Sequence, residues 1–142
     1  WEIPPMYDPI MVAPMRDELI RAGVQSLESA DQVDQILSAP GTTLVVVNSV
    51  CGCAAANARP GVIQTLQHST QPDHVVTVFA GVDREAVDKA RSYFKGYMPS
   101  SPSVGLVKNG ECVFLLQRHE IEGRDPAEIS SRLKEAIDSH CA

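Results

Sequence analysis

Hydrophobic and polar residues alternate along the chain with two different periods, which predict helices and strands. Over residues 10–22 apolar side chains return at helical spacing until Gly23, so we expect a helix in which Pro14 causes a kink or a late start. Thr42–Asn48 is an uninterrupted run rich in β-branched residues, which is typical of a central strand buried on both faces. The remaining pattern predicts helices over about 30–37, 53–68, 84–94 and from Asp125 to the C-terminus, and strands over about 75–80, 103–108 and 111–117.

Local signals indicate where three of these helices begin or bend. Asp83 precedes the helix at 84–94 and is expected to cap it, because aspartate accepts hydrogen bonds from the first free N–H groups. Asp125 followed by Pro126 is the same kind of start signal for the last helix. Pro60 lies inside the helix at 53–68 and lacks an N–H, so that helix should bend.

The order of the elements predicts an α/β fold. Strands that alternate with helices pair in parallel through right-handed crossovers. Asn109-Gly110 is a strong two-residue turn signal, which predicts an antiparallel hairpin between the last two strands. We therefore expect a mixed sheet of about four strands flanked by helices, with an extra helical segment at the N-terminus. No repeat or linker divides the sequence, so residues 1–142 should form a single domain.

Composition and charge exclude several classes of function. The 142 residues carry a net charge of −6 without a basic patch, so we expect no nucleic-acid partner. Apolar runs such as Leu44–Val47 are far too short to cross a membrane, and no export signal opens the chain. Four cysteines are too few for a disulfide-stapled secreted domain, so a reducing, cytoplasmic location is expected. The oligomeric state stays open.

The most informative motif is Cys51-Gly52-Cys53, which lies where the first strand ends and a helix begins. The partial positive charge and free N–H groups of a helix N-terminus favour the thiolate, which is the form that attacks disulfides. Two thiols at such a junction could be a redox couple, a metal clamp or inert core residues. We favour the redox couple, with Cys51 as the nucleophile because it lies nearer the strand end.

The single-residue spacing of the two cysteines predicts an unusual redox couple. A disulfide needs Cα atoms about 4.4–6.8 Å apart, which residues two positions apart reach only with an unusual backbone between them. Gly52 supplies that freedom. A strained ring is reduced more easily, so we expect this couple to be more oxidising than a Cys-x-x-Cys couple.

Other chemically active residues have weaker signals. Cys112 alternates with hydrophobic residues and is expected in the core, whereas Cys141 is interpreted as a frayed tail thiol or, alternatively, a resolving thiol. His119 and Glu120 are interpreted as a solvated pair, with proton transfer as the alternative. Arg59 follows the cysteines and could lower a thiolate pKa, bind acidic groups of a small thiol or form a surface salt bridge.

Four segments make the sequence resemble a known family. They are Thr42–Cys53 with its Cys-Gly-Cys block, Val76–Gly81, Ser100–Ser103 and Arg118–Gly123. Together they are similar to the bacilliredoxin family, which has a thioredoxin-like fold, and the likeness spans nearly the whole chain. The sequence departs from ordinary thioredoxins because Val50 replaces the tryptophan before the first cysteine and the first strand has no buried aspartate.

The resemblance implies a function and a set of site residues. Members are thiol–disulfide oxidoreductases that remove bacillithiol from proteins carrying it as a mixed disulfide. By position Cys51 matches the attacking cysteine and Cys53 the resolving one, while Pro102, after Ser101, matches the cis-proline that faces them. Gly52, Ser101 and Pro102 are thus the expected substrate-binding residues. No cofactor is implied beyond bacillithiol as co-substrate, and the partners would be S-thiolated client proteins.

Three alternatives stay open at this point. Members of the family have been discussed as weak protein disulfide isomerases, which would act on protein disulfides instead. A metal-binding protein could use Cys51 and Cys53 as ligands, although Cys112 and Cys141 form no second pair and no histidine motif is present. A thioredoxin-like interaction domain without catalysis would need neither cysteine of the motif.

Overall fold

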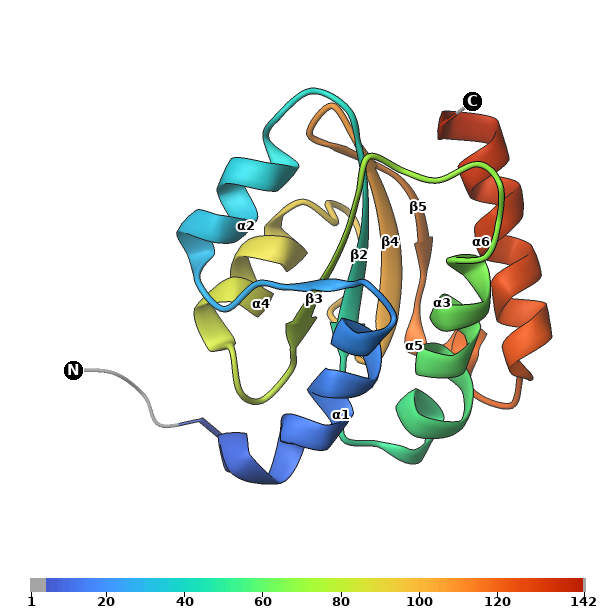
Figure 1. Ribbon diagram of the computed structural model, residues 1–142. Helices are drawn as coiled ribbons and strands as arrows, with labels where there is room; N and C mark the ends of the chain where they lie inside the picture. The colour runs from blue at the N-terminus through green and yellow to red at the C-terminus, as the bar shows by residue number, and fades with distance from the viewer. Residues whose placement is uncertain (1–4, 142) are drawn as a thin grey trace.

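The molecule has three layers, with a mixed sheet between two groups of helices (Figure 1). The structure is a computed structural model and describes residues 5–141, so residues 1–4 and 142 of the expected domain lie outside the described residues. The strands are β1 (Gln25–Ser26), β2 (Thr42–Asn48), β3 (His74–Phe79), β4 (Ser103–Lys108) and β5 (Glu111–Leu116). They are ordered β1-β3-β2-β4-β5, with β1, β3 and β2 parallel and β4 and β5 antiparallel to their neighbours.

The sheet confirms the predicted α/β fold and differs from it by one strand. The sequence predicts about four strands, whereas the sheet has five because the short β1 pairs with β3. Two residues are too few to produce a hydrophobic period, so β1 has no signal of its own. The hairpin forms as predicted: Asn109 and Gly110 have φ angles of 51° and 81° between β4 and β5.

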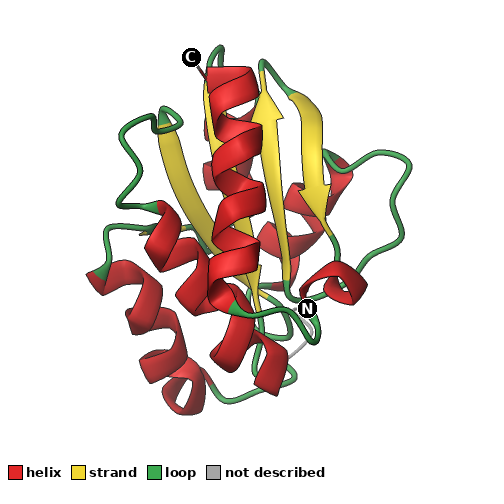
Figure 2. Ribbon diagram, turned by 90° about the vertical axis from the view of Figure 1, so that its right-hand side faces the viewer, coloured by secondary structure: helices red, strands yellow, loops and turns green. Residues whose placement is uncertain are grey.

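The helices cover both faces of the sheet. They are α1 (Pro9–Arg21), α2 (Ala30–Leu37), η1 (Ala54–Ala58), α3 (Arg59–Thr65), α4 (Arg84–Ser92), α5 (Arg118–Ile121) and α6 (Pro126–Cys141). Side chains from α1, α3 and α6 pack with Leu44 and Val46 on one face, and side chains from α2 and α4 pack with Val45 and Val47 on the other. Successive residues of β2 therefore serve opposite cores, which explains its unbroken apolar sequence. Figure 2 shows α6 running across its face of the sheet.

The helix predicted over 53–68 is not a single regular helix. It begins beside the cysteines, widens into the π-helical turn η1 at Ala54–Ala58 and continues as α3 at Arg59–Thr65. Pro60 lies in the first turn of α3, where a missing N–H costs least. The segment is helical without a break over residues 52–65, so the predicted helix forms, with a π-helical turn in its middle. The bend expected at Pro60 stays a prediction.

The helices α5 and α6 differ in how well the sequence predicts them. The four-residue helix α5 has no periodic signal and is missed by the sequence. Asp125 caps α6 as expected, since its carboxylate accepts a hydrogen bond of 2.9 Å from the N–H of Glu128. Leu133 and its apolar neighbours on α6 are buried against the sheet.

Candidate active site

The Cys-Gly-Cys motif lies at one edge of the sheet, between the end of β2 and the start of the η1–α3 helix (Figure 1). Four strands end or begin at this edge, and Asn48 at the end of β2 pairs with Phe79 at the end of β3. Val47 of β2 pairs with Ser103 at the start of β4, and Val104 pairs with Leu116 at the end of β5. The turn before β4 and the segment after β5 are thereby brought to the edge that carries the cysteines.

Cys51 and Cys53 are free thiols whose sulfur atoms lie 2.6 Å apart. Both side chains are partly exposed. Burial alone would raise the pKa of Cys51, but hydrogen bonds from the Cys53 thiol, the Ser49 hydroxyl and the backbone N–H groups of Ala54 and Cys53 favour its thiolate. The pKa of Cys51 is therefore lowered, as expected for an attacking cysteine.

Cys53 has the opposite electrostatic environment. Burial, the hydrogen bond with Cys51 and the charge on Cys51 together raise the pKa of Cys53 to about 11. Glu122 acts in the same direction, and the guanidinium of Arg118 opposes it. Of the two thiols, Cys53 is therefore the one that holds its proton more strongly.

Gly52 lies exposed between the two thiols, and an added Cβ would meet no heavy atom within 4 Å. Its φ angle is outside the left-handed region, so the dithiol state does not require glycine at this position. The conformational freedom expected of Gly52 concerns the disulfide state and stays a prediction.

The turn before β4 carries the other expected substrate-binding residues. The Ser101–Pro102 peptide bond is cis, as the resemblance implied. Arg118 ties this turn to the segment after β5, because its backbone N–H donates to Ser100 Oγ at 3.2 Å and its Nη1 donates to the Ser101 carbonyl at 3.3 Å. Ser101, Pro102 and the thiols thus share one edge of the sheet.

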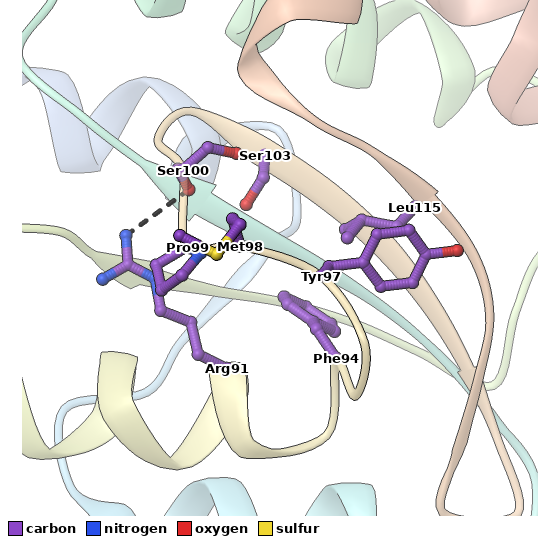
Figure 3. Close-up of a pocket in the computed structure, with 8 residues that line it drawn as sticks. All are labelled: Arg91, Phe94, Tyr97, Met98, Pro99, Ser100, Ser103 and Leu115. Carbon is purple, nitrogen blue, oxygen red and sulfur yellow. Dashed lines mark hydrogen bonds between the residues drawn. The ribbon is translucent and has the colours of Figure 1, made fainter.

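A pocket borders the same turn (Figure 3). Arg91 points into it, and its Nη2 donates to the Ser100 carbonyl at 3.4 Å. Burial lowers the pKa of Arg91, whose Nε is buried without a hydrogen-bond partner. The pocket is lined by Arg91, Phe94, Tyr97, Met98, Pro99, Ser100, Ser103 and Leu115. No local pattern marks it because its walls come from separate elements.

The buried side chain of Arg59 hydrogen-bonds Asn48 and Ser49, which precede Cys51 in the chain. Its side chain is only 5% exposed, and Nη1 donates to Asn48 Oδ1 and to the Ser49 carbonyl, both at 3.0 Å. Nε forms an ion pair of 3.2 Å with Glu18 on α1. Arg59 therefore forms a salt bridge, as the sequence allowed, but its own side chain is buried rather than on the surface, which makes it poorly placed to bind a small thiol.

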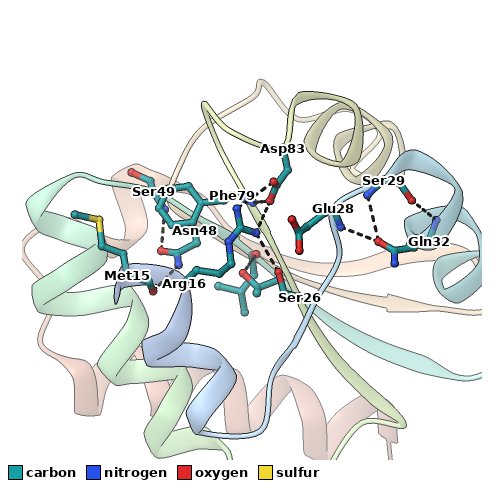
Figure 4. Close-up of polar contacts among 12 residues, drawn as sticks. Met15, Arg16, Ser26, Glu28, Ser29, Gln32, Asn48, Ser49, Phe79 and Asp83 are labelled. Atoms are coloured by element: carbon teal, nitrogen blue, oxygen red, sulfur yellow. Dashed lines mark hydrogen bonds and ion pairs between the residues drawn. The ribbon is translucent and has the colours of Figure 1, made fainter. Parts of the chain in front are cut away.

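Ser49 connects this buried network to the thiol. Its N–H donates to Asn48 Oδ1 at 2.8 Å, and its Oγ accepts from the N–H of Cys51 at 3.1 Å (Asn48 and Ser49 are shown in Figure 4). Asn48 also donates to the Met15 carbonyl at 3.2 Å. Sequence reasoning missed Ser49, although its position two residues before a helix-start cysteine is one where a hydroxyl readily bonds backbone N–H groups.

A second buried network holds α1 on the sheet (Figure 4). The Arg16 guanidinium donates to both carboxylate oxygens of Asp83, at 2.7 and 3.1 Å, and to Ser26 Oγ at 3.0 Å. Asp83 also accepts from the N–H of Phe79 at 3.0 Å, and its side chain makes no cap bond to α4. Asp83 therefore stands at the N-cap position as predicted, but the expected side-chain cap bond is absent because tertiary partners occupy its carboxylate.

The other candidate residues from the sequence are two cysteines and the pair His119 and Glu120. Cys112 packs against the core as expected, and burial raises its pKa. Cys141 is the last residue of α6 and packs partly against the core, so the frayed tail is wrong. Figure 1 places that end of α6 opposite the edge with the motif. His119 is exposed as expected, whereas Glu120 is partly buried and bonds Arg132 at 3.2 Å.

Metal binding would need further ligands. Among residues 5–141, no three His, Cys, Asp or Glu side chains are grouped so that they could hold a metal ion. Cys51 and Cys53 therefore bring two sulfur ligands and no third protein ligand from the part of the chain that the structure describes. None of the helices in that part combines the length and apolar character needed to cross a membrane.

Comparison with known proteins assigns the chain to a family. Residues 7–141 match a family model described as disulphide isomerase. The bacilliredoxin of Koribacter versatilis is 49% identical over 137 residues, which cover 96% of this chain and 94% of the relative. The bacilliredoxin of Bacillus licheniformis is 51% identical over 133 residues and 92% of each chain.

Solved structures show the same fold at low sequence identity. A protein described as having a thioredoxin fold superposes with a TM-score of 0.65 at 20% identity, covering 82% of this chain and 95% of the other. The thioredoxin of Malassezia sympodialis gives 0.56 at 20% identity, with 84% and 92% covered. The fold and the close thiol pair define a thioredoxin-like thiol–disulfide oxidoreductase. Within that class, the chain belongs to the bacilliredoxin family.

Proposed function

We propose that this oxidoreductase reduces mixed disulfides between bacillithiol and protein cysteines. The proposal is carried by one observation: two thiols in contact at an exposed sheet edge, with the pKa of Cys51 lowered and that of Cys53 raised to about 11. A thiolate paired with a protonated neighbour suits attack followed by resolution. The names of its bacilliredoxin relatives support bacillithiol as the small thiol.

The reaction begins with the Cys51 thiolate, which attacks the bacillithiol sulfur of the mixed disulfide. A new disulfide forms between Cys51 and bacillithiol, the old disulfide breaks, and the client cysteine leaves as a thiolate that takes a proton. No net oxidation occurs in this exchange. The client is now reduced, and Cys51 carries the small thiol.

Cys53 then resolves the intermediate. Its thiolate attacks Cys51 Sγ, bacillithiol leaves as a thiolate, and a Cys51–Cys53 disulfide forms. Once Cys51 is in a disulfide, its charge and its hydrogen bond no longer raise the pKa of Cys53, while Arg118 still lowers it. Cys53 therefore becomes more acidic at the step that needs its thiolate. A two-electron thiol reductant must then reset the disulfide.

The proposal also covers the co-substrate, the partners and the cellular location of the protein. Bacillithiol is a co-substrate, and we propose no resident cofactor. The partners are S-thiolated client proteins rather than nucleic acid or a membrane, in keeping with the net charge of −6. We propose a cytoplasmic location, because four sparse cysteines suit a reducing compartment better than a disulfide-stapled secreted domain.

One experiment compares two substrates. The purified protein is supplied with a protein carrying bacillithiol on a single cysteine and, separately, with a scrambled disulfide-bonded protein, each with the same reductant. We expect release of bacillithiol to be at least about tenfold faster, in kcat/KM, than recovery of native disulfides, since a small thiol is an unhindered target. Faster isomerisation than release would overturn the proposal.

Protein disulfide isomerisation is the second candidate. The description of the matching family model favours it, and an acidic Cys51 could also attack protein disulfides. The two-substrate comparison decides between these functions. A metal-binding function requires stoichiometric metal in the purified protein together with no activity on either substrate.

A further inference from the structure

We infer that Arg118 is a binding subsite for a carboxylate of the small thiol held as a mixed disulfide. The inference rests on the proposed function and deepens it by naming the chemical class of the thiol. The sequence expects an arginine near the cysteines to bind acidic groups, and Arg59 cannot, because its guanidinium is buried and hydrogen-bonded inside the protein. Arg118 is exposed, hydrogen-bonds the turn before β4 and lies close enough to Cys53 for its charge to act on that thiol.

The position of Arg118 follows from the sheet. Because β5 ends at the same edge as β2, the residue two positions after β5 returns to the cysteines. Its contacts with Ser100 and Ser101 fix it against the turn that precedes β4. Arg118 is close enough to the sulfurs for its charge to lower the pKa of Cys53.

The guanidinium has donors left for a ligand. Nε donates to the Glu122 carboxylate and Nη1 donates to the Ser101 carbonyl. Nη2 makes no hydrogen bond within the described residues, and the side chain is 46% exposed. The two protein contacts orient the planar group, so its free N–H groups face the solvent in a set direction. An oriented guanidinium suits a carboxylate better than a mobile lysine would.

The chemistry identifies the ligand class as a low-molecular-weight thiol that bears a carboxylate. Bacillithiol belongs to this class through its malate group. When the small thiol is bonded to Cys51, a carboxylate on Arg118 would hold it at a second point, beside Cys53. A neutral small thiol would have the sulfur contact alone, so Arg118 should make the enzyme selective between charged and neutral adducts.

The test measures selectivity rather than activity alone. One peptide is prepared as mixed disulfides with bacillithiol, with glutathione and with neutral 2-mercaptoethanol, and kcat and KM are measured for each. In Arg118→Gln we expect the ratio of kcat/KM for bacillithiol over 2-mercaptoethanol to fall about tenfold, mainly through KM, as loss of an exposed charge-assisted contact predicts. Arg118→Lys should recover part of this ratio.

A matched control is available on the same surface. Arg124 pairs with Glu128 four residues on, as Arg118 pairs with Glu122, and Arg124→Gln should leave the ratio unchanged. A loss shared equally by all three adducts would mean that Arg118 acts only on the thiols and would overturn the inference. Glutathione, which also bears carboxylates, separates the subsite from the proposed substrate. If it is released at the same rate as bacillithiol with the same dependence on Arg118, the carboxylate subsite is supported, but bacillithiol is not the specific substrate.

Discussion

The two active-site cysteines lie in contact, but the protein supports them from different sides. Behind Cys51 is a buried set of hydrogen bonds, in which Arg59 holds Ser49 and Ser49 bonds Cys51. Beside Cys53 is an exposed ion pair between Arg118 and Glu122, whose two charges act on the thiol in opposite directions. Neutral hydrogen-bond donors act on the first cysteine, and solvent-exposed charges act on the second.

This difference shows how one motif can hold two chemical roles. Hydrogen bonds in a fixed network favour the Cys51 thiolate and depend on geometry, so salt should screen them little. The charges beside Cys53 act over a longer range, are screened by salt and change as the bonding of Cys51 changes. The fold therefore fixes the lowered pKa of the nucleophile Cys51, whereas the pKa of the resolving Cys53 thiol changes with the stage of the reaction.

The largest expected effect comes from replacing each cysteine in turn. Cys51→Ser should abolish release of bacillithiol, because no thiolate remains to attack. Cys53→Ser should accumulate the protein with one bacillithiol on Cys51, which intact-mass spectrometry detects. Cys141→Ser is the control and should keep full turnover, since the end of α6 lies at the far side of the molecule. Full turnover by Cys51→Ser would reverse the assigned roles.

The next largest effect tests the buried hydrogen bonds of Arg59 and Ser49 beside Cys51. Arg59→Gln removes donors from the buried Asn48 and Ser49 oxygens, so the free energy of unfolding should fall by about 2–4 kcal/mol in urea denaturation. The pKa of Cys51, followed by thiolate absorbance, should rise as Ser49 loses its support. An unchanged pKa with lower stability would show that Arg59 serves the fold alone.

A milder variant separates chemistry from folding on the same side. Ser49→Ala should raise the pKa of Cys51 with little loss of stability, because one hydroxyl hydrogen bond is lost. Activity that needs the thiolate rises with pH through this pKa, so the midpoint of the pH–rate profile should move to higher pH. Ser38→Ala, at the end of α2, removes a hydroxyl remote from the thiols and should leave the midpoint in place.

The smallest effect tests the exposed ion pair of Arg118 and Glu122 beside Cys53. In a Cys51→Ser background, Glu122→Gln should lower the pKa of Cys53, because a nearby negative charge that disfavours the thiolate is gone. Arg118→Gln in the same background should raise it, and both shifts should shrink in high salt. Glu128→Gln is the matched control. A rise of the pKa in Glu122→Gln would contradict the charge argument.

Much of the fold can be predicted from local sequence. Residues 30–37, 42–48 and 103–108 form the elements expected at those positions, because their patterns are long and regular. The strand β1 and the helix α5 are missed, since they have two and four residues and depend on their neighbours for pairing and packing. The same limit explains Asp83, whose local position indicates a cap while Arg16 provides a stronger partner.

The sequence by itself determined the thioredoxin-like α/β fold, the position of Cys51 and Cys53 at the first strand–helix junction, and the family. The α/β order and the position of the motif depend on hydrophobic period and on adjacent residues, which are local properties of the chain. The thioredoxin-like fold and the family are what the resemblance of four segments to a known family implied. Only the tertiary structure decided that Arg59 is internal and that Arg118 faces the thiols. Their sequence distances from the motif suggest the opposite, because the register of β2, β4 and β5 sets which distant residues meet at one edge of the sheet.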